Sequence, residues 1–210
     1  MAFDPFDWNV IVLGHWNRAI LTPAGIVTRL FDLSPETPVK IEVPVDGMGP
    51  YKITHDQISV VVVPGRLEVA LDLPNFELLD RARQIGVRAL ERLPETPVTA
   101  VGINIRYRSK EPAAELIEAA RCGVDQNLTE ARQEIAGRLL GRALKFKDGL
   151  VNLTLQQRQP DDDACVLVLN FHKSSNQARE LIAWLQVRRP EIEEQVQTIT
   201  RTLPGFETGG

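Results

Sequence analysis

The sequence predicts an α+β fold, in which a largely antiparallel sheet is built from hairpins and helices pack mainly on one of its faces. One observation is the succession of short segments in which apolar and polar residues alternate, joined by tight turns. Another is that 75–93 and the chain from Pro190 onward carry apolar residues at helical spacing. A hairpin followed by a helix occurs at 58–93 and again at 151–186, which suggests a two-lobe pseudo-repeat.

The length of 210 residues fits one domain, which we expect to span 1–204, with sub-lobes 1–110 and 111–204 as an alternative division. Apolar residues make up 43% of the chain and charged residues 25%, which is close to the average for soluble globular proteins. Residues 205–210, with the sequence GFETGG, are expected to form a flexible tail.

Composition argues against several classes of protein. The net charge of −4 is mild and the charges are interspersed, whereas a protein whose main role is nucleic-acid binding needs a basic surface. No apolar run reaches the roughly 18–20 residues that cross a membrane, and the first residues lack the features of a secretory signal. Two cysteines form neither a disulfide framework nor a four-ligand zinc site. We therefore expect a cytoplasmic protein with no membrane association, no cofactor and no metal.

The N-terminal half is predicted from apolar runs and helix caps. Residues 8–14 form an apolar, β-branched run that predicts a buried strand. Thr22 is the expected N-cap of a short helix that ends near residue 31, since Pro23 occupies its first position. Residues 39–45 alternate, so Val39, Ile41, Val43 and Val45 are expected to face inward, while Pro44 restricts this strand to a sheet edge or a bulge. The elements that follow are a short strand 51–55, hairpin strands 58–63 and 66–72, helix 75–93 and strand 98–108.

The sequence Pro-Glu-Thr-Pro-Val occurs twice, at 35–39 and at 94–98. Proline cannot continue a helix, and it also drives the residue before it toward extended geometry. Each copy is therefore interpreted as a connector from a helix to a strand, without a functional role.

The C-terminal half contains one ambiguous segment. Residues 128–146 fit a helix or a strand, and Gly137 and Gly141 favour a strand from about Glu134 to Phe146. The other expected elements are a helix 111–121, strands 150–158 and 165–172 joined by the acidic loop 160–163, a helix 175–187, and a last helix whose apolar seam is Ile192, Val196, Ile199 and Leu203.

Two clusters carry residue types that bind anions. One is the polar face of strand 98–108, and the other lies where strand 165–172 gives way to a helix, whose N-terminus attracts negative charge. The candidate ligand-binding residues are Arg106, Arg108, His172, Lys173, Ser174 and Ser175. The simpler interpretation is that a serine caps the helix while the cations are solvated. The sequence leaves open whether Arg106 and His172 share a pocket.

No catalytic signature is present: the three histidines lack metal-binding spacing, and neither a nucleophile elbow nor a phosphate-binding loop occurs. The overall pattern is similar to that of small bacterial α+β proteins, without a motif that identifies a family. Trp16, Trp184 and Leu185 are the candidates for an interaction surface, with core packing as the alternative.

The function most in keeping with these observations is that of a non-catalytic, cytoplasmic binding or assembly component that contacts another protein or forms a homo-oligomer. One alternative is a binding domain or enzyme for an anionic small molecule that uses Arg106, Arg108, His172 and Lys173. A second, less expected because of the overall acidity, is a nucleic-acid-associated factor that uses the arginines of helix 75–93 (Arg81, Arg88 and Arg92) together with Arg106 and Arg108.

Overall fold

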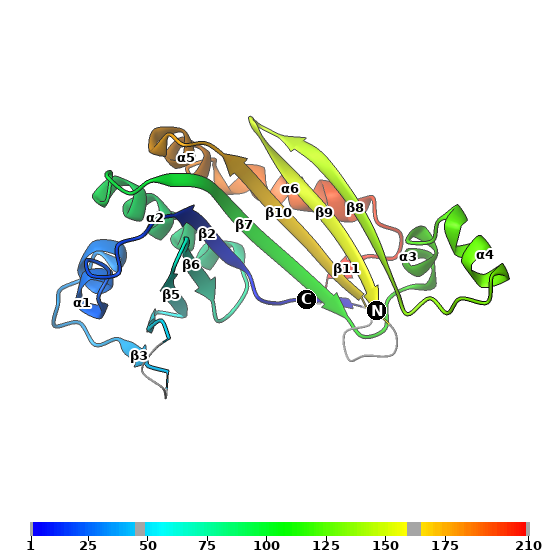
Figure 1. The fold of residues 1–210 in the computed structure, drawn as a ribbon, viewed down its shortest axis with the longest axis horizontal. Coiled ribbons are helices and arrows are strands. Elements are labelled where there is room, and N and C mark those ends of the chain that lie inside the picture. The colour runs from blue at the N-terminus through cyan, green and yellow to red at the C-terminus, as the bar shows by residue number, and fades with distance from the viewer. Residues whose placement is uncertain (1, 45–48, 159–164, 209–210) are drawn as a thin grey trace.

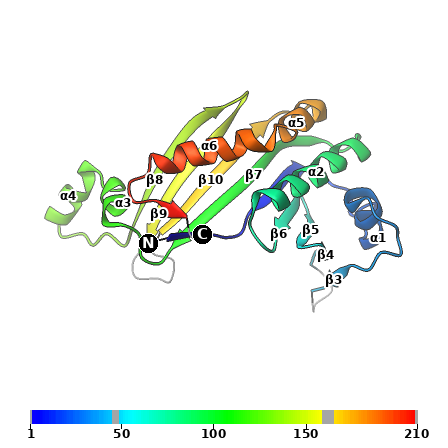
Figure 2. The ribbon, with the colours of Figure 1, turned by 180° about the vertical axis from the view of Figure 1, so that it is seen from behind.

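The computed structural model describes residues 2–44, 49–158 and 165–208 (Figures 1 and 2). It confirms the α+β prediction, because the strands form one mostly antiparallel sheet accompanied by helices. The elements are β1 (Ala2–Pro5), β2 (Asn9–Gly14), α1 (Pro23–Ile26), η1 (Val27–Phe31), β3 (Lys40–Glu42), β4 (Lys52–His55), β5 (Ile58–Val63), β6 (Arg66–Leu71), α2 (Phe76–Arg92), β7 (Val98–Ser109), α3 (Ala114–Ala119), α4 (Gly123–Glu130), β8 (Gly137–Phe146), β9 (Gly149–Arg158), β10 (Cys165–Ser174), α5 (Ala178–Leu185), α6 (Arg189–Arg201) and β11 (Glu207–Thr208).

The main path of the sheet has the order β3-β4-β5-β6-β2-β7-β10-β9-β8. The long central strand β7 joins its two halves, since it pairs with β2 on one side and with β10 on the other. Hairpin β5–β6 leads into α2, and hairpin β9–β10 leads into α5, so the repeated hairpin-helix pattern is found on both sides of β7. The buried side chains of the two sides form one continuous cluster.

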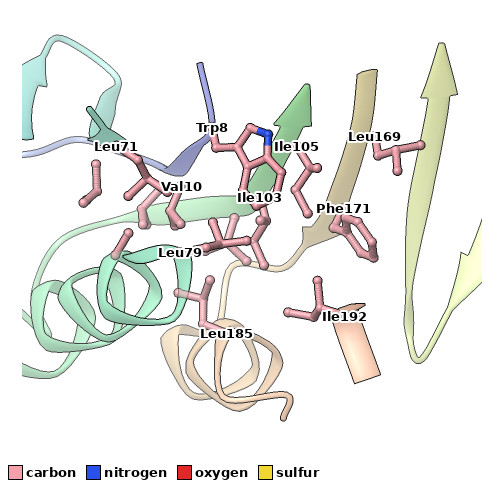
Figure 3. Close-up of a cluster of buried hydrophobic side chains, with 14 of the residues drawn as sticks. Trp8, Val10, Leu71, Leu79, Ile103, Ile105, Leu169, Phe171, Leu185 and Ile192 are labelled. Carbon is pink, nitrogen blue, oxygen red and sulfur yellow. The ribbon is translucent and has the colours of Figure 1, made fainter. Parts of the chain in front are cut away.

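Helices α2, α5 and α6 cover one face of the sheet (Figure 2), whereas the opposite face of β7, β10, β9 and β8 carries no helix (Figure 1). We call this opposite face the open face. Alternate residues of the strands supply the core on the helical side, where Ile103 and Phe171 meet Leu79, Leu185 and Ile192 from the helices (Figure 3). Burial of these side chains provides the main driving force for the layered arrangement.

Local sequence accounts for several boundaries. Asn75 caps α2 by accepting a hydrogen bond from the Leu78 amide at 2.8 Å, and Thr22 caps α1 in the same way. The two Pro-Glu-Thr-Pro-Val copies form equivalent turns, because the amide of Thr37 donates to Ser34 and that of Thr96 donates to Leu93. Both connectors therefore follow the prediction.

Residues 123–146 resolve the ambiguous segment. They form α4 and then β8, which confirms a strand, although it begins at Gly137 rather than near Glu134. The helix expected over 175–187 is shorter and spans Ala178–Leu185. The acidic loop 160–163 lies outside the described residues.

One expectation for the sheet margins is corrected. Strand β3 is at a sheet edge as predicted, but Ile41 and Val43 are 46% and 56% exposed rather than inward. Val45 lies outside the described residues. At the C-terminus, residues 207–208 pair with β1, and Phe206 stacks on Phe3 with ring centroids 4.6 Å apart; the flexibility of 205–210 stays a prediction.

Candidate functional site

The structure does not bring the predicted anion-binding residues into one pocket. Arg106 and Arg108 lie on the open face, and so does His172, because it pairs with Gly102 on that side. His172 is four residues along β10 from the position opposite Arg106, a separation of about 13 Å along the strand. Lys173 lies on the helical side of the sheet.

The cationic members of this set are already engaged within the chain. Arg106 Nη1 binds Asp7 Oδ2 at 2.6 Å, and the Arg108 guanidinium stands 5.2 Å from the centre of the Phe6 ring. Lys173 Nζ binds Asp148 Oδ2 at 2.7 Å, and this hydrogen bond lowers the pKa of the Asp148 carboxyl. An incoming anion would have to displace carboxylates at two separate places.

The two serines stabilise the turn between β10 and α5. Ser175 Oγ accepts a hydrogen bond from the Gln177 amide at 3.0 Å and donates one to Glu180 Oε2 at 2.8 Å. Ser174 Oγ lies 2.8 Å from His172 Nε2. The N-cap position itself is Gln177, two residues after Ser175, so neither serine is the N-cap that the simpler interpretation expected.

The three residues expected at an interaction surface belong to the core. Trp16, Trp184 and Leu185 are 6%, 3% and 1% exposed, and Trp16 Nε1 donates to the Val12 carbonyl at 3.0 Å. Their apolar spacing on helices and loops reflects closure of the protein's own core. They are therefore not placed to contact a partner.

The arginines of α2, considered for nucleic acid, also have partners. Arg81 pairs with Asp56 at 3.2 Å, Arg92 pairs with Asp32, and Arg88 Nε donates to the Leu30 carbonyl at 2.6 Å. These contacts tie α2 to the first helix and to the β4–β5 turn. No continuous strip of unpaired cations forms along this helix within the described part of the chain.

Sequence reasoning missed a ladder of four asparagines that crosses the open face. Asn104 Nδ2 donates to Asn9 Oδ1 at 2.7 Å, and Asn170 Nδ2 donates to Asn104 Oδ1 at 2.8 Å. Asn152 Nδ2 continues the series to Asn170 Oδ1 at 3.2 Å, and Asn9 Nδ2 ends it at Glu68 Oε1. Each asparagine looks like an ordinary polar position in its own strand, so only the register reveals the ladder.

The ladder fixes the alignment of four strands rather than presenting free polar groups. Asn9 and Asn104 are 3% and 6% exposed, and the side-chain amide of Asn104 donates to the side-chain oxygen of Asn9. A shift of any strand by one residue would move its asparagine to the apolar side. This polar row therefore specifies the register of β2, β7, β10 and β9.

The most distinctive open feature is the outer edge of β8. This strand of ten residues pairs with β9 without interruption from Gly137 to Phe146, and no other described strand pairs with it. It is the last strand of the sheet in Figure 1, where α3 and α4 stand beyond its N-terminal end. Leu139, the third residue of this strand, is 68% exposed.

The hairpin geometry shows which backbone groups face outward. A two-residue turn, Lys147-Asp148, joins Phe146 to its partner Gly149, which places the hydrogen-bonded pairs at Phe146 and every second residue before it. The amides and carbonyls of the odd-numbered residues 139, 141, 143 and 145 are therefore directed away from β9. These groups form a row of outward donors and acceptors, in which the Gly141 carbonyl accepts a hydrogen bond from Arg142 Nη1 at 2.7 Å.

Comparison with protein-family models, with curated proteins and with solved structures finds no match to this chain.

The charges along β8 are all positive. Arg138 Nε binds Asp125 Oδ2 at 2.5 Å, and this hydrogen bond lowers the pKa of the Asp125 carboxyl. Arg142 and Lys145 are exposed, and no carboxylate of the described residues pairs with either. The next lysine, Lys147, is bound by Glu191.

Glu191 anchors the tip of the β8–β9 hairpin to α6. Hydrogen bonds from Lys147 and then from Arg188 lower the pKa of the Glu191 carboxyl to about 2. At the same tip Gly149 packs so closely that an added Cβ would lie 2.5 Å from the His172 carbonyl oxygen. One end of β8 is therefore held firmly against the rest of the molecule.

The hollows of the described surface are shallow grooves. One of about 620 Å³ lies between α3, α4 and the first residues of β8, and is lined by Arg121, Cys122 and Arg138. Another of about 590 Å³ follows α2 beside the α5–α6 turn. Arg83, which lines this groove, is buried and donates hydrogen bonds to Asp80 and to the carbonyl groups at and just after the end of α5.

Within the described residues, histidine, cysteine and carboxylate side chains do not gather into a group of three that could hold a metal ion. A helix long and apolar enough to span a membrane is likewise not found there.

Proposed function

We propose that this protein is a non-catalytic binding component that contacts another protein along β8, the open edge of its sheet. The observation that carries the proposal is the ten-residue strand β8, which is paired on one side only. A long edge strand presents unpaired N–H and C=O groups and is a ready template for another strand.

The two edges of the sheet differ in a way that supports this assignment. The opposite edge strand, β3, has three residues and carries the ion pair Lys40–Glu42 at 2.8 Å. Short, charged edges are a common way in which proteins prevent unwanted pairing. The long, flat edge of β8 is therefore the better candidate for a retained binding surface.

Strand addition also supplies affinity without a deep pocket. Main-chain hydrogen bonds provide the binding energy in such complexes, and side chains on alternating positions provide the specificity. The exposed Leu139 offers an apolar contact beside these backbone groups. A shallow surface of this kind suits a protein partner better than a small molecule.

The proposal includes a cytoplasmic location. Cys122 is a free, exposed thiol and Cys165 a free, buried one. Unpaired thiols of this kind persist in reducing compartments.

A site-specific photo-crosslinker tests the proposal. It is introduced at Leu139 on β8, and at Leu73 as a control that is comparably exposed but lies between β6 and α2. We expect the natively purified protein to form a covalent adduct with a partner from position 139 and not from position 73. Light scattering on the same preparation should show a mass above that of the 23.5 kDa chain. A strictly monomeric protein without an adduct at position 139 contradicts the proposal.

A further inference from the structure

We propose that the β8 edge accepts an acidic, extended segment of a partner protein, which joins the sheet as an additional strand. This inference rests on the proposed function and names the chemistry of its partner. It is carried by the juxtaposition of outward backbone groups with Arg142 and Lys145 on the same strand, neither of which forms an ion pair with a carboxylate of the described residues.

The two cations lie on opposite faces of the sheet, so side chains on either face of an added strand can contact one of them. Side chains alternate along β8, so Lys145 lies on the open face while Arg142 lies on the helical side. Residues directly opposite on neighbouring antiparallel strands have Cβ atoms about 4.5–5.5 Å apart, within reach of an ion pair. Carboxylates on a paired segment would therefore meet a cation on either face.

The charge of the edge is opposite to that of the molecule. The whole chain has a net charge of −4, yet β8 contains no aspartate or glutamate and its neighbour β9 contains none either. A partner attracted to the general surface would be basic, whereas a partner attracted to this edge must be acidic. Such local complementarity contributes to specificity and to the rate of association.

A second copy of this chain would place like charges opposite each other in two of the antiparallel registers. In a pair centred on Arg142, the two guanidinium groups would be directly opposite each other. In a pair centred on Leu140, Arg138 of one copy would be opposite Arg142 of the other. Like charges directly opposite destabilise a sheet, so these two registers disfavour self-pairing. Registers centred on Gly141 or Ala143 avoid this repulsion, so the mass measured by light scattering distinguishes a second copy from a different, acidic chain.

The room available sets the length of the added strand. Helices α3 and α4 stand beside the N-terminal end of β8, where Arg138 is held by Asp125. No described strand pairs with the outer side of β8, and beyond its N-terminal end no helix lies along that side in Figures 1 and 2. An extended segment of about seven residues can pair there, with the polar groove at α3–α4 next to one of its ends.

Direct binding of short peptides tests the proposal. The probes are two fluorescein-labelled peptides of about the length of β8, one alternating glutamate with valine and the other alternating lysine with valine. We expect the acidic peptide to raise the fluorescence anisotropy when the full-length protein is added, and the lysine peptide to have no effect. Added salt should weaken the binding because these charges are exposed. Amide exchange at residues 139, 141, 143 and 145 should slow when the acidic peptide is bound.

Variants of β8 separate backbone pairing from charge. Ala143→Pro removes an outward N–H without removing a β9 hydrogen bond, and proline is tolerated on edge strands. It should abolish binding, whereas the matched Ala143→Val retains the N–H and should preserve it. Thermal unfolding of both variants verifies that the sheet remains intact.

Charge reversal provides the second arm. Arg142→Glu with Lys145→Glu should weaken binding of the acidic peptide by about tenfold or more and allow the lysine peptide to bind. Arg18→Glu with Arg29→Glu changes the net charge equally, at exposed sites near α1, and should leave binding unchanged.

Equal binding of the two peptides, or a charge reversal that leaves the preference unchanged, overturns the acidic partner while leaving strand addition in place. If neither peptide binds, and the Ala143→Pro variant still forms the crosslink with its partner, the proposal of strand addition is wrong. The cations would then serve only to prevent pairing of other strands with this edge. The absence of any crosslinked adduct at Leu139 would instead contradict the proposed function, which is binding of a protein along β8.

Discussion

Asn104 at the centre of the asparagine ladder is the position where one substitution should disturb the largest part of the sheet. Its side chain donates to Asn9 and accepts from Asn170, so it joins β2, β7 and β10 through two hydrogen bonds of 2.7 and 2.8 Å. Asn104→Ala removes both bonds at once. Asn152→Ala is the matched control, because Asn152 stands at the end of the same ladder and makes a single bond of 3.2 Å.

The expected cost follows from what each substitution leaves behind. Asn104→Ala leaves Asn9 Oδ1 without its partner in a residue that is only 3% exposed. An orphaned buried polar group costs about 1–3 kcal/mol, and the half-buried Asn170 amide adds up to about 1 kcal/mol because water can partly replace its partner. We therefore expect the free energy of unfolding to fall by about 1–4 kcal/mol. The control should cost less than about 1 kcal/mol, because one end of its bond is already accessible to water.

Urea unfolding followed by tryptophan fluorescence measures these values, since Trp8, Trp16 and Trp184 are all buried. A loss of about 1–4 kcal/mol corresponds to a fall of about 0.5–2 M in the urea midpoint. A double-mutant cycle with Asn170→Ala should give a coupling energy of about 1 kcal/mol. The reasoning is refuted if Asn104→Ala costs no more than the Asn152→Ala control.

Three further predictions concern other parts of the molecule. Gly149→Ala should lower the stability by about 1–3 kcal/mol in thermal unfolding, because its Cβ would lie 2.5 Å from the His172 carbonyl oxygen, whereas Gly141→Ala, which meets only a side-chain carbon at 3.9 Å, should be nearly neutral. Hydrogen bonds from a lysine and then an arginine lower the pKa of the Glu191 carboxyl to about 2, so the stability that these contacts contribute is complete above the ordinary pKa of 4.5 and is lost as the pH falls toward 2. The stabilities of Glu191→Gln and the unmodified protein should therefore converge near pH 2. A titration of this carboxyl followed by NMR should have its midpoint near 2 rather than 4.5. Burial raises the pKa of the Cys165 thiol to about 11, so a thiol reagent at pH 8 should label a single cysteine in the folded protein and both after unfolding; labelling of both in the native state would contradict the burial.

Features that depend on a few neighbouring residues could be predicted. The hairpin of strands 58–63 and 66–72, the cap Thr22 and both proline connectors follow from turn chemistry and helix capping, and the structure has each of them. The strand at 137–146 was recoverable despite its ambiguous periodicity, because two glycines weaken a helix more than they weaken an edge strand. In each case the physical cause lies within one turn or one hairpin.

The candidate site was much harder to predict. Arg106 and Lys173 both looked like anion ligands, but β10 places Lys173 on the helical side, where Asp148 binds it. Trp184 looked like a surface anchor until the packing of α5 buried it. The partners that decide these outcomes are distant in the chain and cannot be paired from composition or spacing.

The sequence alone determined the α+β class, most of its helices and strands, and the position of its connectors, because alternation, helical periodicity and proline geometry act over a few residues. Only the tertiary structure decided that four asparagines meet in one row and that β8 is the end of the sheet, with its outward amides and the cations Arg142 and Lys145. Strand order and register are set by contacts between residues far apart in the chain, so the edge that remains open is a property of the whole fold.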